Sequence, residues 1–366
     1  MSKGLKYRFL FAGGGTGGHL YPAIAIAQAI KEIKPESEIL FIGSSDKIES
    51  KVVPQNGFAF KSITVKGFNR QDKLKNLLFP IFLILSMIQS LAITMKFKPK
   101  VSIGTGGYVS GPAIWAASVM GSKIILVEPN SYPGITTRLL ERFADEIHIC
   151  FEMTKKYLRR NDIIKITGNP IRKTFKLIDK KSAIKKFSLF DEHKTLLIVG
   201  GSLGAKSINN AIKKIYKDLL ENNIQIIWQV GKNYYDELKG LENSKCRIFP
   251  FIENIEDAFS ACDLVVSRAG ASSISEISLL GIPSILVPSP NVAENHQYYN
   301  AKELADQNAA ILIEDKNLEL ELKEKIIKTI NDEFLLSQLK ENIRKFAKPD
   351  ASILIAKSAI NYSEQV

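Results

Sequence analysis

Residues 7–22, YRFLFAGGGTGGHLYP, join a short apolar run to a glycine cluster and then to a helix-like segment. The run Tyr7–Ala12 predicts a buried strand. Apolar residues at helical spacing in His19–Ile33 predict the following helix, with Pro22 tolerated near its start. A strand, a glycine turn and a helix in this order are typical of the first unit of a doubly wound fold. The stretch therefore predicts a parallel sheet with a ligand loop at the end of its first strand.

The same alternation continues through both halves of the chain. In the first half, further strands are predicted at Glu38–Gly43, Val101–Gly104 and Lys123–Val127. In the second half, the order restarts and predicts strands at Thr195–Val199, Gln225–Val230, Asp263–Ser267 and Ser284–Val287. Short apolar strands alternating with helices favour parallel sheets that are covered on both faces. We therefore expect two similar α/β domains that face each other, with ligand sites at the carboxyl ends of the strands and hence in the cleft.

The expected joint between the domains lies near Gly168-Asn169-Pro170. We place the first domain at residues 1–171 and the second at residues 172–349. A last helix, at about 350–366, is expected to pack back on the first domain.

Composition limits the class of protein further. The chain has 366 residues, 45% of them hydrophobic, and a formal net charge of +12, which favours an anionic partner. Its three cysteines are widely spaced without a C-x-x-C pair, so neither a zinc site nor a disulfide framework is expected. No apolar signal segment precedes the first predicted strand.

Three glycine loops follow predicted strands: Gly13–Gly18, Gly104–Tyr108 and Gly200–Gly204. The first satisfies G-x-G-x-x-G, but the next predicted strand ends in Gly43-Ser44-Ser45 without the acid that a dinucleotide site requires. No P-loop signature occurs at these loops. One such loop could be only a tight turn. Three of them favour two phosphate-bearing ligands, because free amides at a helix start bind anions.

Several motifs, in order along the chain, resemble the MurG family of peptidoglycan N-acetylglucosaminyltransferases. The resemblance begins with Gly14-Gly15-Thr16-Gly17-Gly18-His19-Leu20-Tyr21-Pro22. It continues through Gly106–Pro112, Thr167–Arg172, Gly200–Ala205, Ser267–Ala271, Ser275-Glu276, His296-Gln297 and Asn300-Ala301. Together these matches are highly specific, and they extend from residue 13 to about residue 301.

The resemblance implies two facing Rossmann-like domains of the GT-B type and an inverting sugar transfer without a metal or another cofactor. The implied donor is UDP-N-acetylglucosamine. The implied acceptor is the C4 hydroxyl of undecaprenyl-pyrophosphoryl-N-acetylmuramyl-pentapeptide. Two alternatives stay open: a related glycosyltransferase acting on diacylglycerol, and an inactive module that binds a UDP-sugar. Nucleic acid is not expected, because the basic stretch brackets aliphatic residues and lacks interleaved exposed aromatics.

The resemblance also implies site residues, motif by motif. For the donor these are Thr16, Gly17, Gly18, Asn130, Arg172, Ser202, Ile252, Ala271, Glu276 and Gln297. Glu276 is assigned to the ribose hydroxyls, Ile252 to the uracil, and Asn130 and Gln297 to the sugar. For the acceptor pyrophosphate they are Gly15, Gly106, Gly107 and Tyr108.

Two residues depart from the family pattern. Leu203 stands where the third loop usually has glutamine, so one side-chain hydrogen bond to the donor is lost. Pro129 replaces the middle residue of a Glu-Gln-Asn triplet and removes a backbone donor.

The acceptor hydroxyl needs a base, and the leaving UDP needs its negative charge stabilised. His19 follows a glycine loop at a helix start, where a lowered pKa would favour the neutral form, so we predict it as the base. Alternatively, His19 positions the acceptor or caps the helix, and Glu128 acts as the base. Arg172, and less firmly Arg268, could stabilise the diphosphate or form structural ion pairs. Glu276 could likewise be only a first-turn acid.

Leu77–Met95 is a run of 19 residues without a charge. Between Lys61 and Lys100 there are eight basic residues and a single acid, Asp72. We expect a half-buried helix whose outer face, flanked by Lys73, Lys75, Lys96 and Lys98, enters an anionic lipid surface. A buried core helix and a spanning helix are the alternatives. The predicted location is peripheral, on the cytoplasmic face of a bacterial plasma membrane.

Overall fold

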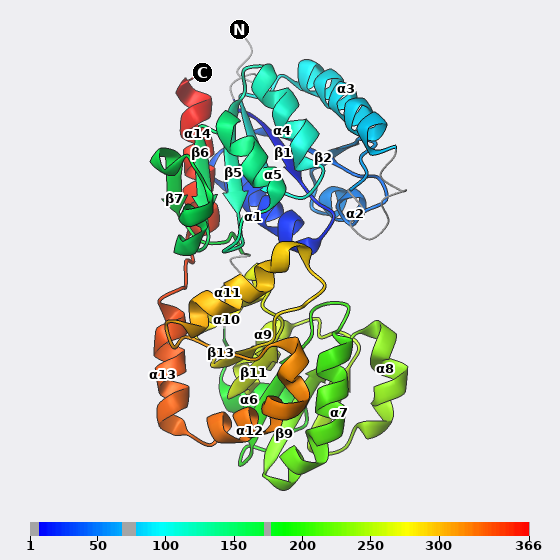
Figure 1. The fold of residues 1–366 in the computed structure, drawn as a ribbon, viewed down its shortest axis with the longest axis vertical. Helices are drawn as coiled ribbons and strands as arrows, with labels where there is room; N and C mark the ends of the chain where they lie inside the picture. The colour runs from blue at the N-terminus through cyan, green and yellow to red at the C-terminus, as the bar shows by residue number, and fades with distance from the viewer. Residues whose placement is uncertain (1–6, 68–77, 172–176, 366) are drawn as a thin grey trace. The chain divides into compact units, whose positions relative to one another are not determined.

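Two sets of parallel strands, one in each half of the chain, organise the protein. A computed structural model describes residues 7–67, 78–171 and 177–365. The chain divides into unit 1, residues 1–172 and 348–366, and unit 2, residues 173–347 (Figure 1). Each unit contains a parallel sheet with helices packed on it, so the predicted α/β class is confirmed.

Unit 1 has a seven-stranded sheet in the order β3-β2-β1-β4-β5-β6-β7, and all its pairings are parallel. The strand order reverses between β1 and β4, where Phe9 pairs with Val101. In doubly wound folds, ligands bind beside the carboxyl ends of the strands at this switch point. The strands are β1 (Arg8–Gly13), β2 (Glu38–Gly43), β3 (Ala59–Ser62), β4 (Val101–Gly106), β5 (Lys123–Glu128), β6 (Glu146–Ile149) and β7 (Ile164–Ile166).

Helices cover both faces of this sheet and create two cores. On one face, α1 (Gly17–Ile33), α2 (Glu49–Gln55) and α14 (Ala351–Gln365) bury Phe9, Phe11 and Phe41 of the strands. On the other face, α4 (Ser110–Val119) and α5 (Ile135–Leu140) pack on the alternate strand residues. Helix α3 (Phe79–Phe97) lies outside α4. Apolar residues alternate along the strands and are buried on both sides, as a parallel sheet requires.

Unit 2 has a six-stranded parallel sheet in the order β10-β9-β8-β11-β12-β13, and its switch point lies between β8 and β11. The strands are β8 (Lys194–Val199), β9 (Ile224–Gln229), β10 (Cys246–Phe249), β11 (Leu264–Ser267), β12 (Ser284–Leu286) and β13 (Ile311–Leu312).

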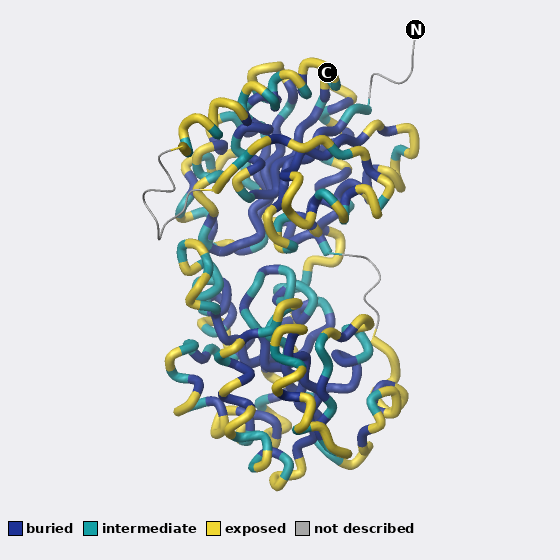
Figure 2. Tube along the Cα trace, turned by 90° about the vertical axis from the view of Figure 1, so that its right-hand side faces the viewer, coloured by how far each residue is buried: buried dark blue, intermediate teal, exposed yellow. Residues whose placement is uncertain are grey.

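A separate core holds unit 2 together. Residues of α7 (Lys206–Glu221) and α12 (Leu318–Ile330) pack with the fully buried Trp228 on one face of the sheet. The buried strands stand out inside each unit in Figure 2. The remaining helices are α6 (Lys180–Lys186), α8 (Lys232–Leu238), α9 (Ile255–Ala261), α10 (Ala271–Leu280), α11 (His296–Ala305) and α13 (Glu333–Arg344).

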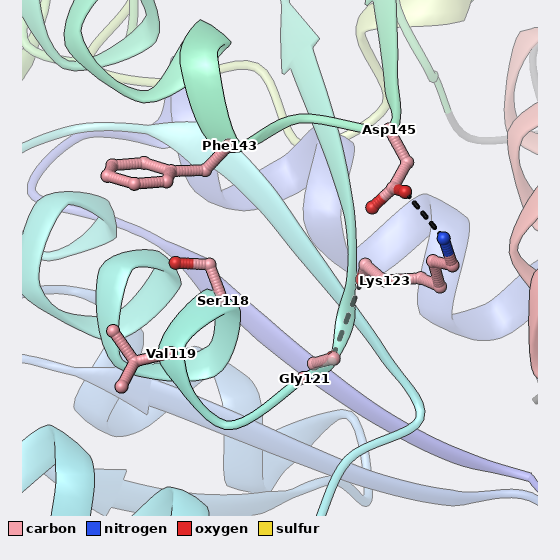
Figure 3. A pocket seen from close by; sticks show the side chains of 7 residues that line it. Ser118, Val119, Gly121, Lys123, Phe143 and Asp145 are labelled. Atoms are coloured by element: carbon pink, nitrogen blue, oxygen red, sulfur yellow. Dashed lines mark hydrogen bonds and ion pairs between the residues drawn. The ribbon is translucent and has the colours of Figure 1, made fainter.

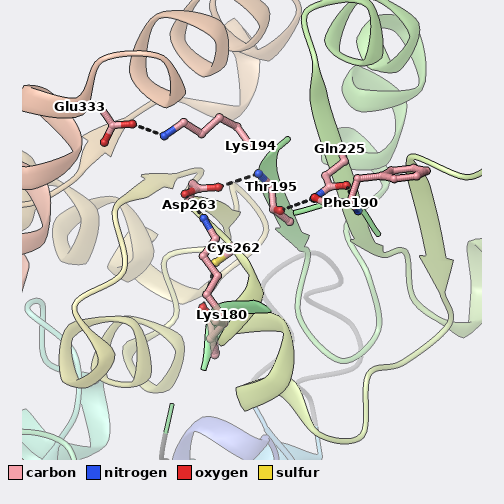
Figure 4. Close-up of polar contacts among 9 residues, drawn as sticks. Lys180, Phe190, Lys194, Thr195, Gln225, Cys262, Asp263 and Glu333 are labelled. Atoms are coloured by element: carbon pink, nitrogen blue, oxygen red, sulfur yellow. Dashed lines mark hydrogen bonds and ion pairs between the residues drawn. The ribbon is translucent and has the colours of Figure 1, made fainter. Parts of the chain in front are cut away.

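Polar side chains fix the amino ends of the strands in unit 2 (Figure 4). Asp263 accepts a hydrogen bond from the Thr195 amide at 2.8 Å and pairs with Lys180. Gln225 bonds both the amide and the carbonyl of Phe190 and also the Thr195 hydroxyl. These contacts lie at the opposite edge of the sheet from the glycine loop that follows β8.

The predicted strands are confirmed with boundaries shifted by one or two residues. Helix α1 starts at Gly17, two residues before the predicted start, because the glycine cluster itself supplies the first turn. The short strands β3, β6, β7, β10 and β13 are not among the predicted ones. They have two to four residues each, too few for an alternating pattern to stand out.

A buried carboxylate ties α14 to the sheet of unit 1. Glu146 on β6 accepts hydrogen bonds from Lys165 Nζ at 2.7 Å and from Ser358 Oγ at 2.6 Å. His148 Nε2 lies 2.6 Å from Glu146 Oε1, the same oxygen that accepts from Ser358. Burial alone would raise the pKa of Glu146, but the hydrogen bonds from His148, Lys165 and Ser358 outweigh it and lower the pKa to about 2.

Replacing Glu146 with glutamine should destabilise unit 1 at pH 7 by about 1–3 kcal/mol, because the buried His148 and the partners Lys165 and Ser358 lose a charged acceptor. A depressed carboxyl pKa contributes stability above the unfolded value of 4.5, and this contribution is lost as the pH falls towards 2. The gap between the urea midpoints of parent and E146Q should therefore narrow over that range. Glu152→Gln, which alters the exposed pair with Lys155, is the matched control and should change little. A gap that is constant from pH 7 to pH 2 would contradict this assignment.

Candidate functional site

The first and second glycine loops meet at the switch point of unit 1. A Cβ placed on Gly107 would lie 2.4 Å from the Gly14 carbonyl oxygen, and one on Gly13 would lie 1.8 Å from Thr105 Oγ1. Glycine is thus required for the approach of the two backbones. The structure brings together six of the predicted residues: Gly15, Thr16, Gly17, Gly18, Gly106 and Gly107. Tyr108 follows them and is 56% exposed, with its ring against Gly67.

The start of α1 presents backbone amides at this place. Thr16 is the N-cap residue, no side chain caps the helix among the described residues, and its first turn contains no acid. By contrast, Asp179 caps α6 and Asp332 caps α13. An uncapped helix start with a positive dipole end is suited to bind a phosphate.

His19 is held in one tautomer by the second loop. Its Nδ1 donates a hydrogen bond of 2.9 Å to the Thr105 carbonyl, which can only accept, so Nε2 carries the free lone pair. The Thr105 hydroxyl in turn donates to the His19 carbonyl at 2.7 Å. Burial lowers the pKa of His19, and the bond to Thr105 opposes this only in part. The ring bonds the neighbouring strand end and not its own helix, which argues against a capping role.

Glu128, the alternative base, is fully engaged by its own loop. One carboxylate oxygen accepts from the amide and the side chain of Asn130, and the other accepts from the Gly134 amide and the Thr137 hydroxyl. Burial raises its pKa, and these four hydrogen bonds act in the opposite direction. The arrangement fixes Asn130, a predicted site residue, and makes Glu128 a residue that positions it.

Glu49 was not singled out from the sequence. It is buried behind the first glycine loop, where its carboxylate accepts from the Gly15 amide and from the Ser44 amide, both at 3.0 Å. A Cβ on Gly14 would lie 2.5 Å from this carboxylate. Glu49 therefore fixes the loop at the amide of Gly15. Its partners lie up to 34 residues away in the sequence, so no local pattern could have pointed to it.

In unit 2, the third glycine loop and the turn after β11 lie side by side at the switch point. Val199, which precedes the loop, pairs with Ser267, which precedes the turn. Ala271 begins α10, whose first turn has no acid and no side-chain cap among the residues described. The Ser272 hydroxyl there is buried and has no hydrogen-bond partner in the described part of the chain. Ser202 and Leu203 are exposed on the neighbouring loop, Leu203 to 75%.

Ile252, Glu276 and Gln297 are further predicted donor residues of the same unit, whereas the predicted donor residues Thr16, Gly17, Gly18 and Asn130 lie in unit 1. Ile252 is buried, and Gln297 at the start of α11 accepts a hydrogen bond from the Ser289 amide at 2.9 Å. The Gln297 amide nitrogen lies 4.0 Å from the Cβ position of Gly270, just before α10. Glu276 is the sixth residue of α10 and not a first-turn acid, so helix capping does not explain it.

Two arginines, Arg172 and Arg268, were predicted as candidates to stabilise the diphosphate. Arg268 donates to the carbonyls of Val287 and Pro288, to Ser207 and to Asp315, which is the structural ion pair weighed as the alternative. Arg172 lies outside the described residues.

Figure 3 shows a cavity of about 350 Å³ that is lined by Ser118, Lys123, Phe143 and Asp145, among others. It lies at the amino end of β5, whereas the glycine loops follow the carboxyl ends of the strands. None of the predicted site residues line it. Within the residues described, no group of three histidine, cysteine, aspartate or glutamate side chains could hold a metal ion.

Comparison with known proteins identifies the family. Residues 9–149 match the glycosyltransferase family 28 N-terminal domain, and residues 195–355 match the C-terminal domain of that family. A relative from Flavobacterium psychrophilum is 43% identical over 352 residues, which are 95% of each chain. Another, from Bacteroides thetaiotaomicron, is 41% identical over 98% of each chain. Both are named UDP-N-acetylglucosamine--N-acetylmuramyl-(pentapeptide) pyrophosphoryl-undecaprenol N-acetylglucosamine transferase. The chain belongs to the MurG family of glycosyltransferases.

Solved structures agree with the fold of this family. MurG from Acinetobacter baumannii matches with a TM-score of 0.78 at 24% identity, over 96% of this chain and 99% of that one. The calicheamicin glycosyltransferase CalG4 matches with a TM-score of 0.72 at 9% identity, over 97% of this chain and 98% of that one. The predicted GT-B type of fold and the predicted enzyme class, a hexosyltransferase, are confirmed.

His19→Ala should lower the turnover of sugar transfer by about 10²–10⁴-fold while leaving UDP affinity nearly unchanged, because a general base acts on the acceptor proton. In the parent, turnover should fall only as the pH drops through a value below 6.5, since burial lowers the pKa of His19 and the base must be neutral. His193→Ala, in a polar stretch of unit 2, is the control. H19A turnover within threefold of the parent at saturating substrates would exclude His19 as the base.

Proposed function

We propose that this protein transfers N-acetylglucosamine from UDP-N-acetylglucosamine to the C4 hydroxyl of undecaprenyl-pyrophosphoryl-N-acetylmuramyl-pentapeptide, with inversion at the sugar carbon. The observation that carries the proposal is the near full-length identity to relatives named for this transfer. The loops at both switch points support it, because they offer two separate sets of anion-binding amides for two phosphate-bearing substrates.

The donor is assigned to unit 2. Uracil lies at Ile252, the ribose hydroxyls bond the Glu276 carboxylate, and Gln297 contacts the sugar. The diphosphate lies at Ser202 and at the backbone amides of the uncapped start of α10. Arg172 is assigned to the same diphosphate, and Asn130 of unit 1 to the sugar, on the family resemblance. Leu203 offers no hydrogen bond, so the third loop binds through its backbone and Ser202.

The acceptor is assigned to unit 1, with its pyrophosphate at Gly15, Gly106, Gly107 and Tyr108, whereas Thr16, Gly17 and Gly18 of the first loop are assigned to the donor on the family resemblance. In the transfer, His19 Nε2 takes the proton of the C4 hydroxyl as that oxygen bonds to the sugar carbon. The bond from this carbon to the phosphate oxygen breaks on the opposite side, and the electron pair leaves with UDP. Backbone amides at helix starts stabilise the charge that develops on the diphosphate.

One assay tests this function directly. Radiolabelled sugar should pass from UDP-N-acetylglucosamine to a lipid-linked muramyl-pentapeptide, and diacylglycerol should remain unlabelled. Label on diacylglycerol would favour the related lipid glycosyltransferases. Label on neither acceptor, with intact UDP binding, would favour an inactive binding module.

Glu276→Ala should weaken UDP binding by about 1–3 kcal/mol in calorimetry, because the ribose hydroxyls lose a charged acceptor. Binding of the lipid-linked acceptor should change little, since the two substrates are assigned to different units. Glu237→Ala removes an exposed carboxylate paired with Lys213 in the same unit and is the control. UDP affinity that is equal in E276A and the parent would refute the ribose assignment.

We further propose that α3 is the membrane contact of this enzyme, on the cytoplasmic face of the plasma membrane. Its polarity is inverted relative to a soluble helix. The side chains that it buries are Ser86, Ser90 and Thr94, one turn apart, on the side that packs on α4. Its exposed side carries apolar residues, including Ile81, Ile84 and Ile88, each at least 58% exposed.

Exposure of this kind speaks against a buried core helix. In the described ranges, α3 is the one helix long and apolar enough to cross a membrane, and only 17% of its most apolar window is buried. It nevertheless packs on α4 of a sheet domain, which favours a helix lying in the interface. Lys96 and Lys98 are exposed at its carboxyl end, while Lys73 and Lys75 lie outside the described residues.

Replacing Ile81, Ile84 and Ile88 together with serine should abolish sedimentation with anionic vesicles, because the apolar face no longer gains from burial in lipid. Transfer to a soluble short-chain acceptor should remain nearly intact. The control replaces Leu320 and Phe334, exposed apolar residues of unit 2, with serine and should sediment like the parent.

The same sedimentation assay also tests the contribution of the basic residues to vesicle binding. Lys96→Gln with Lys98→Gln should weaken vesicle binding and reduce its salt sensitivity, since each basic residue near an anionic surface contributes ~1 kcal/mol. A parent protein that never sediments with vesicles would remove the membrane contact altogether. Resistance to high salt and carbonate would instead indicate a spanning helix.

A further inference from the structure

Gln229, at the carboxyl end of β9, connects two of the segments assigned to the donor. Its side chain is 3% exposed. The amide nitrogen donates to the Gly201 carbonyl in the third glycine loop at 3.1 Å. The amide oxygen accepts from the backbone N–H of Ile252 at 2.9 Å. One buried carboxamide thus touches the loop assigned to the diphosphate and the segment assigned to the uracil.

Both hydrogen bonds depend on the carboxamide group. Glutamine can donate and accept at the same end, whereas a carboxylate only accepts and would face the Gly201 carbonyl with a like partial charge. Gly201 lies 28 residues before Gln229 in the sequence and Ile252 lies 23 residues after it, so the carboxamide links two segments that are distant along the chain. The Gly201 carbonyl also accepts from the Gly204 amide at 3.1 Å, so the Gln229 side chain bonds the same oxygen that closes the turn of the loop.

The third loop is a tight turn that only glycine can form at two of its positions. Gly201 and Gly204 both have positive φ angles, 89° and 78°, which few other residues would adopt. Gly204 is packed so tightly that a Cβ would lie 1.9 Å from the Val230 carbonyl oxygen. With its carbonyl bonded to Gln229, Gly201 points this oxygen into the protein, where it does not repel a phosphate.

We propose that Gln229 is a positioning residue that holds the diphosphate loop and the uracil segment in one fixed relation, so that the two halves of the UDP moiety bind cooperatively. The inference rests on the proposed donor site in unit 2. It assigns no contact with the substrate to Gln229 itself. Its effect passes through the backbones of Gly201 and Ile252.

The chain contains a matched control on the same strand. Gln225 is also buried and also bridges backbone groups, those of Phe190, but at the opposite end of β9 (Figure 4). Gln225→Glu and Gln229→Glu should therefore both lower the melting temperature of the full-length protein. Only Gln229→Glu should affect nucleotide binding.

Calorimetry with UDP and with uridine tests the proposal. At pH 8, Q229E should bind UDP about tenfold more weakly or worse than the parent, the effect of losing a buried hydrogen bond. Uridine, which meets only one of the two segments, should lose less. Q225E should match the parent for both ligands.

Protonation of the carboxyl group introduced by Q229E should restore UDP affinity, which would not be expected if Gln229 only stabilised the fold. Burial raises the pKa of a carboxyl group, and a protonated carboxyl again donates and accepts, as the carboxamide does. The UDP affinity of Q229E, relative to the parent at each pH, should therefore recover as the pH falls from 8 to 5.5. If Q229E does not fold at pH 8, purification and measurement at pH 5.5, followed by a pH shift, give the same comparison.

Equal UDP affinity in parent and Q229E, or equal losses in Q229E and Q225E, would overturn the role of Gln229 and leave the proposed function intact. Equal losses for UDP and uridine would also overturn it, because the two halves would then not be coupled. A parent that does not bind UDP would overturn the proposed function and this inference with it.

Discussion

Backbone packs directly on backbone where the Gly14 carbonyl meets Gly107, and the site in unit 1 depends on this contact. Because neither loop has a side chain there, the ends of β1 and β4 approach closely enough for Thr105 to bond His19 through both its carbonyl and its hydroxyl. The tautomer of the proposed base is thus a consequence of glycine packing. Unit 2 repeats the solution, since a Cβ on Gly231 would lie 2.2 Å from the Leu203 carbonyl oxygen. In both units, a helix start that has no side-chain cap from any described residue follows the glycine contact at the switch point.

The direction of the main-chain N–H and C=O groups in these loops is fixed by hydrogen bonds with buried polar side chains. Glu49 bonds the amide of Gly15, Glu128 bonds the amide of Asn130, and Gln229 bonds the carbonyl of Gly201. Each is buried, and each bonds main-chain groups, with Glu128 also accepting from the side chains of Asn130 and Thr137. A carboxylate occurs where the neighbouring backbone presents only N–H groups, because it can only accept. A carboxamide occurs where the neighbouring backbone presents both a C=O and an N–H, because it can donate and accept.

Much of this arrangement could be predicted from the sequence. Apolar runs that end in glycine located β1, β4 and β8 and the loops after them, because strand burial and backbone flexibility leave local patterns. Glu49 and Gln229 left no such pattern, since their partners come from distant segments that only the folded sheet brings together. Arg268 is a case in which a local pattern was visible but did not decide the role. An arginine that follows a strand looks the same in the sequence whether its side chain binds an anion or pairs with Asp315. The sequence also did not indicate which face of α3 points outward. Apolar residues occur on all sides of that helix, and the positions that it buries are serine and threonine.

Helix α14 has a consequence for how the chain is made. This helix supplies Ile355, Ala356, Ala359 and Ile360 to the core around α1, although the rest of unit 1 precedes residue 173. Unit 2 is continuous, whereas unit 1 is interrupted by it. During synthesis from the amino terminus, unit 2 can therefore complete its core while unit 1 still exposes the apolar surface of α1. The core of unit 1 therefore depends on a helix that is translated only after the whole of unit 2.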